Sequence, residues 1–157
     1  MAEKVERFAD IEAEFARYVT DIKYATMTTV DKLGRPRSRV LFPIWELTGG
    51  KPVGWLASYR TKVKAAHLAG NPHTTYSYWS PRQNAVHVDS RSAWEDDPAV
   101  KARVWELYRA GSPAGLGYDP ARYWESPADP GFHVIRIEPW RVQVVRGTDL
   151  RSLIWQP

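Results

Sequence analysis

The spacing of apolar residues predicts three helices. Between residues 5 and 19 they recur at steps of three and four, the spacing of one helical face, at Phe8, Ile11, Phe15, Tyr18 and Val19. A second helix is predicted over residues 61–69, where helix-forming residues run on until Gly70-Asn71-Pro72. A third begins at Asp97-Pro98, an N-cap followed by proline at the first helical position, and ends near Gly111.

Other segments are rich in Thr, β-branched and aromatic residues and are bounded by turn residues, which is typical of strands. They cover residues 24–30, 36–45, 53–58, 73–79, 85–93, 132–138 and 140–146. The first three are joined by short turns and predict an antiparallel meander. The last two are predicted as separate strands because Pro139 lies between them.

This order of elements favours a mainly β, α+β fold. Strands outnumber helices and do not alternate with them, so an antiparallel barrel is favoured over a doubly wound sheet. A length of 157 residues fits one domain, which we expect to span residues 1–157. Residues 111–131 contain four Pro and four Gly and are predicted to form an ordered loop or lid.

Composition excludes several kinds of site. The chain has no cysteine, which removes disulfides, thiolate metal sites and cysteine nucleophiles. We expect no metal site, because the four histidines lack a metal-binding spacing: His67, His73, His87 and His133. The opening residues hold no hydrophobic block, and no segment reaches the roughly 20 apolar residues of a membrane helix. A cytoplasmic protein without a membrane partner is expected.

Charge and aromatic content suggest an anionic, ring-shaped ligand. The net charge is +4, which is compatible with a phosphorylated partner. Eight Trp and eight Tyr exceed the needs of one small core and favour a partner surface or a planar ligand. We expect aromatic residues in or after the lid to line a pocket or a dimer interface: Tyr118, Tyr123, Trp124 and Phe132. No nucleic-acid-binding signature is present, so nucleic acid is not an expected partner.

Two segments offer the chemistry of a phosphate site. Residues 58–64 lie where a strand ends and a helix begins, and exposed N–H groups there could join the Ser58 and Thr61 hydroxyls and the Arg60 and Lys62 cations. A simple helix cap with solvated cations is an equally good interpretation. On the second strand, alternation places Arg35, Arg37 and Arg39 on one face. These arginines could bind phosphate or protect an edge strand.

Taken in order, these motifs resemble the pyridoxamine 5'-phosphate oxidase-related flavoproteins, and most of all the small bacterial general-stress-protein branch. The resemblance spans roughly residues 20–146. It is carried by Thr28-Thr29-Val30, Gly34-Arg35-Pro36-Arg37-Ser38-Arg39, Ser58-Tyr59-Arg60-Thr61-Lys62-Val63, Asn71-Pro72 and Asp96-Asp97-Pro98.

The resemblance implies an FMN-binding split β-barrel that forms a homodimer with two cofactors at the subunit interface. The phosphate would be held by Arg39, Arg60, Thr61 and Lys62, the ring would lie along Ala57 and Ser58, and Gln83 or Asn84 would approach the cofactor. The full set of implied cofactor-binding residues is Arg37, Arg39, Val40, Ala57, Ser58, Arg60, Thr61, Lys62, Gln83 and Asn84.

The chain also departs from true oxidases of pyridoxamine phosphate. Ile44 stands where they carry Lys, Val144-Val145 where they carry an aromatic residue and Trp, and the tail lacks their Arg-x-His signature. Vitamin B6 oxidation is therefore not expected. We expect an FMN-dependent oxidoreductase and nominate no catalytic side chain, because the flavin performs that chemistry. The alternatives are an F420-dependent oxidoreductase on the same fold and a non-catalytic flavin- or haem-binding protein.

Overall fold

The computed structural model describes residues 2–157. Its strands are β1 (Ala2–Val5), β2 (Ala25–Val30), β3 (Pro36–Leu41), β4 (Ile44–Glu46), β5 (Val53–Ser58), β6 (His73–Trp79), β7 (Ala85–Glu95), β8 (His133–Val145) and β9 (Ser152–Trp155). Its α-helices are α1 (Glu12–Ile22), α2 (Lys62–Gly70) and α3 (Pro98–Ala110), and two short 3-10 helices are η1 (Phe8–Asp10) and η2 (Pro120–Arg122). Each of the seven predicted strands and three predicted helices has a counterpart.

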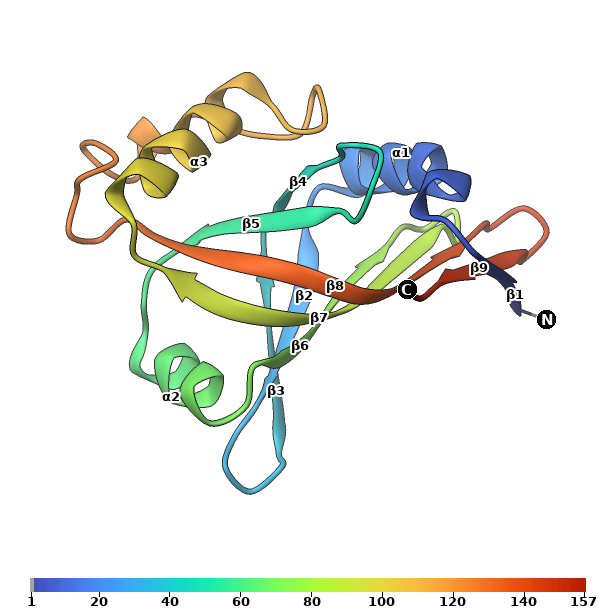
Figure 1. Cartoon of the computed structure of the whole chain (residues 1–157), viewed down its shortest axis with the longest axis horizontal. Coiled ribbons are helices and arrows are strands. Elements are labelled where there is room, and N and C mark those ends of the chain that lie inside the picture. Colours follow the sequence, from blue (N-terminus) through green and yellow to red (C-terminus); the bar gives the residue numbers. More distant parts are fainter. Residues whose placement is uncertain (1) are drawn as a thin grey trace.

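The strands form one strongly curved sheet that does not close (Figure 1). The main path is β1-β9-β8-β7-β6-β2-β3, and β5 branches from β8 and carries β4. Every pairing is antiparallel except that of β1 with β9, which is parallel. The mainly β, α+β class and the split-barrel architecture are therefore confirmed.

One predicted break is absent, because β8 runs through Pro139 as a single strand. Asp89 pairs with Arg141 and Ser90 with Pro139, so the register shifts and Trp140 is left as the extra residue of a bulge. The bulge accommodates a residue that has no N–H to donate. It also marks the fork in the sheet, since residues 133–137 pair with β5 and residues 142–145 with β9.

The predicted meander of the first three strands is wrong. The segment expected as one strand over residues 36–45 is two strands, because the fixed φ and missing N–H of Pro43 interrupt the ladder. Its first half, β3, pairs with β2, whereas its second half, β4, pairs with β5. In Figure 1 the β2–β3 hairpin projects away from β4 and β5.

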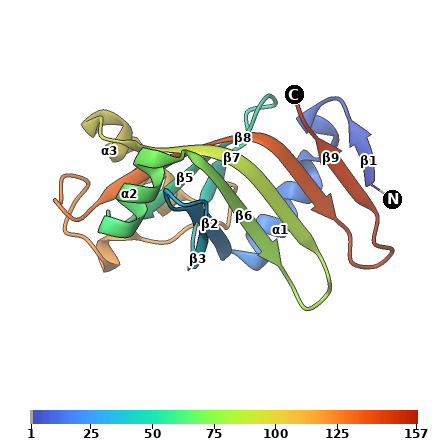
Figure 2. The same cartoon turned by 90° about the horizontal axis from the view of Figure 1, so that it is seen from below.

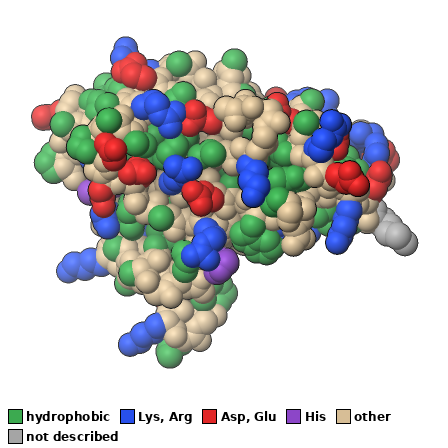
Figure 3. Space-filling model, viewed as in Figure 1, with side chains coloured by type: hydrophobic (Ala, Val, Ile, Leu, Met, Phe, Trp, Pro, Cys, Tyr) green, Lys and Arg blue, Asp and Glu red, His purple; other side chains and the backbone are tan. Residues whose placement is uncertain are grey.

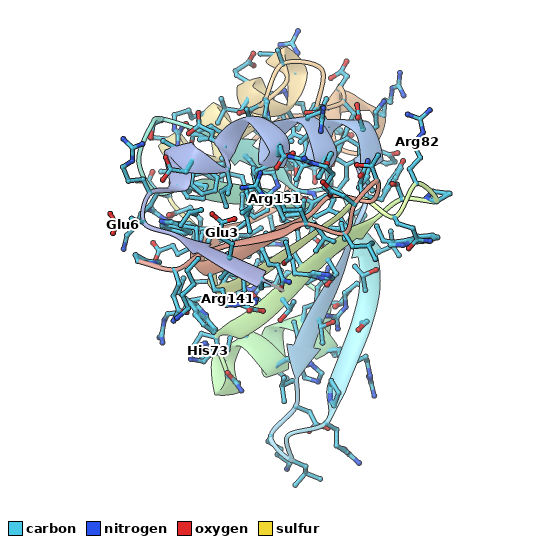
Figure 4. The ribbon with its side chains drawn as sticks, turned by 90° about the vertical axis from the view of Figure 1, so that its right-hand side faces the viewer. Glu3, Glu6, His73, Arg82, Arg141 and Arg151 are labelled. Atoms are coloured by element: carbon cyan, nitrogen blue, oxygen red, sulfur yellow. The ribbon has the colours of Figure 1, made fainter. Side chains whose placement is uncertain are left out.

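The edge strands β1 and β9 were not predicted, since four residues carry too weak an alternation. Residues 5–19 were expected to be one helix, but they contain the end of β1, the η1 turn and most of α1. Ala2 lies opposite Ser152, and Arg151 forms a 3.1 Å ion pair with Glu3 (Figure 4). The N-terminal segment is thereby attached to the C-terminal edge of the sheet.

The helices pack on the sheet through aromatic side chains. Phe15 of α1 meets Trp45 edge to face at 5.3 Å, and the Trp45 indole N–H donates to the Tyr78 hydroxyl at 2.9 Å. Tyr108 of α3 donates to the Phe42 carbonyl at 2.7 Å and accepts from the Ala57 N–H at 3.0 Å. This buried hydroxyl ties α3 to β5 and to the chain between β3 and β4. Within residues 2–157, no helix combines the length and apolar character needed to cross a membrane.

Candidate functional site

A pocket of about 390 Å³ lies where β5 ends and α2 begins. Ala57 and Ser58 contribute from the strand, Thr61 and Lys64 from the first turn of the helix, and the segment before β2 and the β3–β4 connection supply the neighbouring wall. Residues 118–124, in the segment predicted to be an ordered loop or lid and called the lid below, border the remaining side. The lining residues are Tyr24, Leu41, Phe42, Ala57, Ser58, Tyr59, Thr61, Lys64, Tyr118, Arg122, Tyr123 and Trp124.

Lys64 supplies the buried charge of this pocket. Only 6% of it is exposed, and its ammonium donates a hydrogen bond to the Ser58 hydroxyl. Burial and, to a lesser extent, the charge of the nearby Arg39 guanidinium together lower the pKa of Lys64 to about 8. The Thr61 hydroxyl caps α2 by accepting the Lys64 backbone N–H at 3.4 Å. The predicted cap at Thr61 is thus also part of the pocket.

Arg39 is held against α2 by a short chain of hydrogen bonds. Its guanidinium donates to the Thr29 hydroxyl at 2.8 Å and lies 3.4 Å from the Met27 carbonyl oxygen. The Thr29 oxygen also lies 2.8 Å from Nδ1 of His67, a residue of α2 on the same buried side as Lys64. Burial, followed by the charge of Arg37, lowers the pKa of Arg39. Two strands and a helix therefore fix the position of this cation.

Neither Arg39 nor Lys64 forms an ion pair with a carboxylate among residues 2–157. Figure 3 shows that the charged side chains visible over α2 and the β2–β3 hairpin, in the lower part of the view, are Lys and Arg. Two partly buried cations without an acidic partner, one of which lowers the pKa of the other, form a natural anion site. The arrangement can bind a phosphate through charge and through the donors at the start of α2.

Several residues implied by the resemblance lie outside the pocket. Lys62 is exposed at the first position of α2, and Arg37 and Val40 are exposed on β3. Arg60 forms a 3.1 Å ion pair with Asp96 and stacks on the Trp94 ring at 4.9 Å. Of the cofactor-binding residues predicted from the sequence, three line the pocket: Ala57, Ser58 and Thr61. Arg39 lies close enough to Lys64 for its charge to lower the pKa of that lysine.

Gln83 and Asn84 are also remote from this pocket within one chain. They lie in the β6–β7 turn, which Figure 2 places at the far end of the sheet from α2. Asn84 accepts the Gly147 N–H at 2.9 Å, and Gln83 accepts from the Trp79 indole at 3.3 Å with a positive φ of 65°. Both side chains therefore have local structural partners.

The β6–β7 turn borders a larger pocket of about 620 Å³, whose lining includes Tyr18, Asp21, Trp79, Arg82 and Asn84. Its charged side chains have opposite signs, and it lacks a buried cation. It is therefore a poorer anion site than the pocket at α2.

Sequence reasoning missed Lys64 and selected Lys62 instead. Helical spacing could have found Lys64, because it lies three and four residues before the buried His67 and Leu68 and so shares their face. When a helix follows a strand, a lysine on the apolar side of that helix is therefore a better candidate for a buried anion site than an exposed lysine beside it.

The lid supplies a wall of aromatic rings, as predicted for three of its residues. Tyr118, Tyr123 and Trp124 line the pocket, whereas Phe132 is buried behind Trp124 at a ring separation of 5.1 Å. The Trp124 indole donates to the Gly131 carbonyl at 2.9 Å, which fixes its ring. None of the four histidines lines the pocket, and residues 2–157 contain no cluster of potential metal ligands.

An open, mostly antiparallel sheet with this strand order defines a protein of the split-barrel class. The family model described as pyridoxamine 5'-phosphate oxidase matches residues 11–146, and the chain belongs to this family. The family placement expected from the sequence motifs is confirmed. A sequence comparison with curated proteins gives no significant match.

Solved structures share the fold at low sequence identity. A Clostridium acetobutylicum protein related to general stress protein 26 has a TM-score of 0.69 and 14% identity, covering 94% of this chain and 95% of that one. A pyridoxamine 5'-phosphate oxidase-related, FMN-binding protein from Nostoc punctiforme has a TM-score of 0.66 and 14% identity, covering 90% and 86%. A heme binding protein from Mycobacterium smegmatis has a TM-score of 0.63 and 21% identity, covering 97% and 59%.

Proposed function

We propose that this chain is an FMN-binding flavoprotein whose phosphate site is built around Lys64 and Arg39. The observation that carries the proposal is the pair of partly desolvated cations with no acidic partner, set beside two hydroxyls at the start of α2. A phosphate would satisfy both charges and accept from the Ser58 and Thr61 hydroxyls. The description of the Nostoc punctiforme protein as FMN-binding supports this choice.

The remainder of the pocket fits a planar ring system. Ala57 is small and lies at the end of β5, which leaves room for a flat ligand to approach the strand. The lid contributes Tyr118 and Trp124, whose apolar rings would cover such a ligand and exclude water. The cations and hydroxyls of the pocket thus suit the phosphate of FMN, and its aromatic side chains suit the conjugated ring.

We further propose an oxidoreductase role. When bound, FMN supplies hydride or electron transfer, so the protein needs no general acid or base of its own. Lys64 and Arg39 would bind and orient the cofactor, and the lid would keep water from it. Ile44 and the C-terminal segment lack the features of true pyridoxamine phosphate oxidases, so the substrate is a different one.

Haem and F420 are the competing ligands on this fold. The Mycobacterium smegmatis protein is described as heme binding. The pocket described above has no histidine among its lining residues, which removes the commonest axial ligand of haem. The anionic tail of F420 could pair with the same cations as an FMN phosphate, so binding measurements must include it.

Titration of the purified protein with FMN, riboflavin, F420 and haemin tests the cofactor assignment. Because riboflavin lacks only the phosphate, we expect FMN to bind at least about 100-fold more tightly, a difference of about 2.7 kcal/mol. Flavin fluorescence or calorimetry gives both dissociation constants. Equal binding of FMN and riboflavin would refute the phosphate site, and tighter binding of F420 or haemin would replace FMN as the cofactor.

We also propose a homodimer in which the β6–β7 turn of one subunit approaches the pocket of its partner. The support is the distance of Gln83 and Asn84 from the pocket of their own chain, together with Trp79, which is 59% exposed beside that turn. Sedimentation equilibrium should give twice the 18.0 kDa mass of one chain. If the protein were a monomer and still bound FMN tightly, a cofactor site built from residues of two subunits would be ruled out.

A further inference from the structure

The aromatic wall of the pocket is continuous and extends beyond the anion site. Its rings follow one another edge to face or tilted, with centroid separations between 5.3 and 5.7 Å. In order around the pocket they are Tyr24, Phe42, Tyr118, Tyr123, Trp124 and Tyr59. Tyr59 and Tyr123 remain 54% and 61% exposed, so ring surface is available to a ligand.

A second cation belongs to this wall. Arg122 lines the pocket from η2, and its guanidinium has no ion pair or side-chain hydrogen bond among residues 2–157. The nearby Asp119 accepts the Ala121 N–H at 3.1 Å as the cap of η2. No carboxylate lines the pocket. Arg122 is therefore a free bidentate donor beside exposed ring surface, on a different element from Lys64.

We propose that the lid binds a co-substrate with a planar aromatic or conjugated ring and a carboxylate that pairs with Arg122. This inference rests on the proposed function, because it names the class of co-substrate for the same pocket. Tyrosine and tryptophan rings favour flat partners, and a guanidinium recognises a carboxylate through two parallel hydrogen bonds. A cationic co-substrate is disfavoured, since both charged side chains that line the pocket are positive.

Binding of 2-naphthoate and its neutral isostere 2-naphthamide tests the proposal without any turnover. Calorimetry on the FMN-loaded protein should show naphthoate binding at least tenfold more tightly than naphthamide. Arg122→Ala should remove this preference, and Arg122→Lys should retain part of it. The matched control is Arg151→Ala, because Arg151 carries the same charge but lies beside β9, where it pairs with Glu3 (Figure 4). That control should keep the full preference.

The possible failures are distinguishable. Equal binding of the two probes, or a preference that Arg151→Ala lowers as much as Arg122→Ala does, would overturn the inference. A preference lost in Lys64→Ala but kept in Arg122→Ala would overturn it too, because the carboxylate would then occupy the phosphate site. A separate FMN titration of Arg122→Ala gives the cofactor affinity of this variant, so that the two probes are compared at equal FMN loading. Failure of the wild type itself to bind FMN would instead refute the proposed function.

Discussion

Replacing Lys64 with alanine should weaken FMN binding by about 30-fold to 100-fold while leaving riboflavin binding nearly unchanged. The reason is that a charge-assisted hydrogen bond to phosphate contributes about 2–3 kcal/mol when the donor is buried and already positioned. Arg39→Ala should have an effect of similar size, because Thr29 holds that guanidinium at 2.8 Å beside α2. Calorimetric titration of each variant with both ligands measures the two effects separately.

Lys62→Ala is the matched control, since Lys62 carries the same charge two residues earlier but is exposed. Its effect on FMN affinity should stay within about threefold, as expected of a screened surface charge. If Lys62→Ala were the more damaging substitution, the phosphate would lie outside the pocket and the choice made from the sequence alone would be right.

The same lysine gives the binding reaction a characteristic pH dependence. Because the pKa of Lys64 is lowered to about 8, the ammonium of the free protein loses its proton as the pH rises through that value. FMN affinity should therefore fall above about pH 8 in the wild type and stay level in Lys64→Arg. Folding responds with the opposite sign: the folded pKa lies below the ordinary value of 10.5, so the unfolded chain holds more protons between these limits. Stability therefore gains from this group as pH rises across the window.

Gly147→Ala should lower the free energy of unfolding by about 2–3 kcal/mol. A Cβ atom on Gly147 would overlap the carbonyl oxygen of Arg82 and lie 2.8 Å from the carbonyl carbon of Gln83. Both neighbours are backbone, so the β6–β7 turn must shift and the 2.9 Å hydrogen bond from Gly147 to Asn84 must stretch. Urea unfolding of the variant and the wild type measures the difference.

Gly50→Ala provides the comparison for this prediction. Nothing lies within 4 Å of a Cβ built on Gly50, so the substitution should change stability by less than about 0.5 kcal/mol. Similar unfolding curves for the two alanine variants would show that the β6–β7 turn can move without cost.

The parts of the fold that the sequence predicted are those with a local signal. The caps at Thr61 and Asp97 each hold a backbone N–H where they were expected to, and the turns at Gly34 and Gly49 have the positive φ that glycine favours. Pro43 and Pro139 show which features the neighbouring residues do not predict. Pro43 separates two strands, whereas Pro139 lies within one strand at a bulge. Whether a proline ends a strand depends here on pairing partners that are distant in the sequence.

The same limit applies to the pocket. Ser58 and Thr61 were found because they mark the junction of a strand and a helix, a feature of neighbouring residues. Arg122 was missed, because its position beside β5 follows from the path of the lid across more than 60 residues of sequence. The ion pair of Arg60 with Asp96 could not be anticipated either, because the two residues lie 36 positions apart.

The pairing of β1 with β9 has a consequence for the order in which the chain folds. Ala2 is opposite Ser152, so the ribosome makes one edge of this pair about 150 residues before the other. At typical elongation rates of about 5–20 residues per second, residues 2–5 are made about 8–30 seconds before their pairing partners. Because the entropy cost of loop closure grows with the separation of the paired residues, we expect β1 to join the sheet after the other strands.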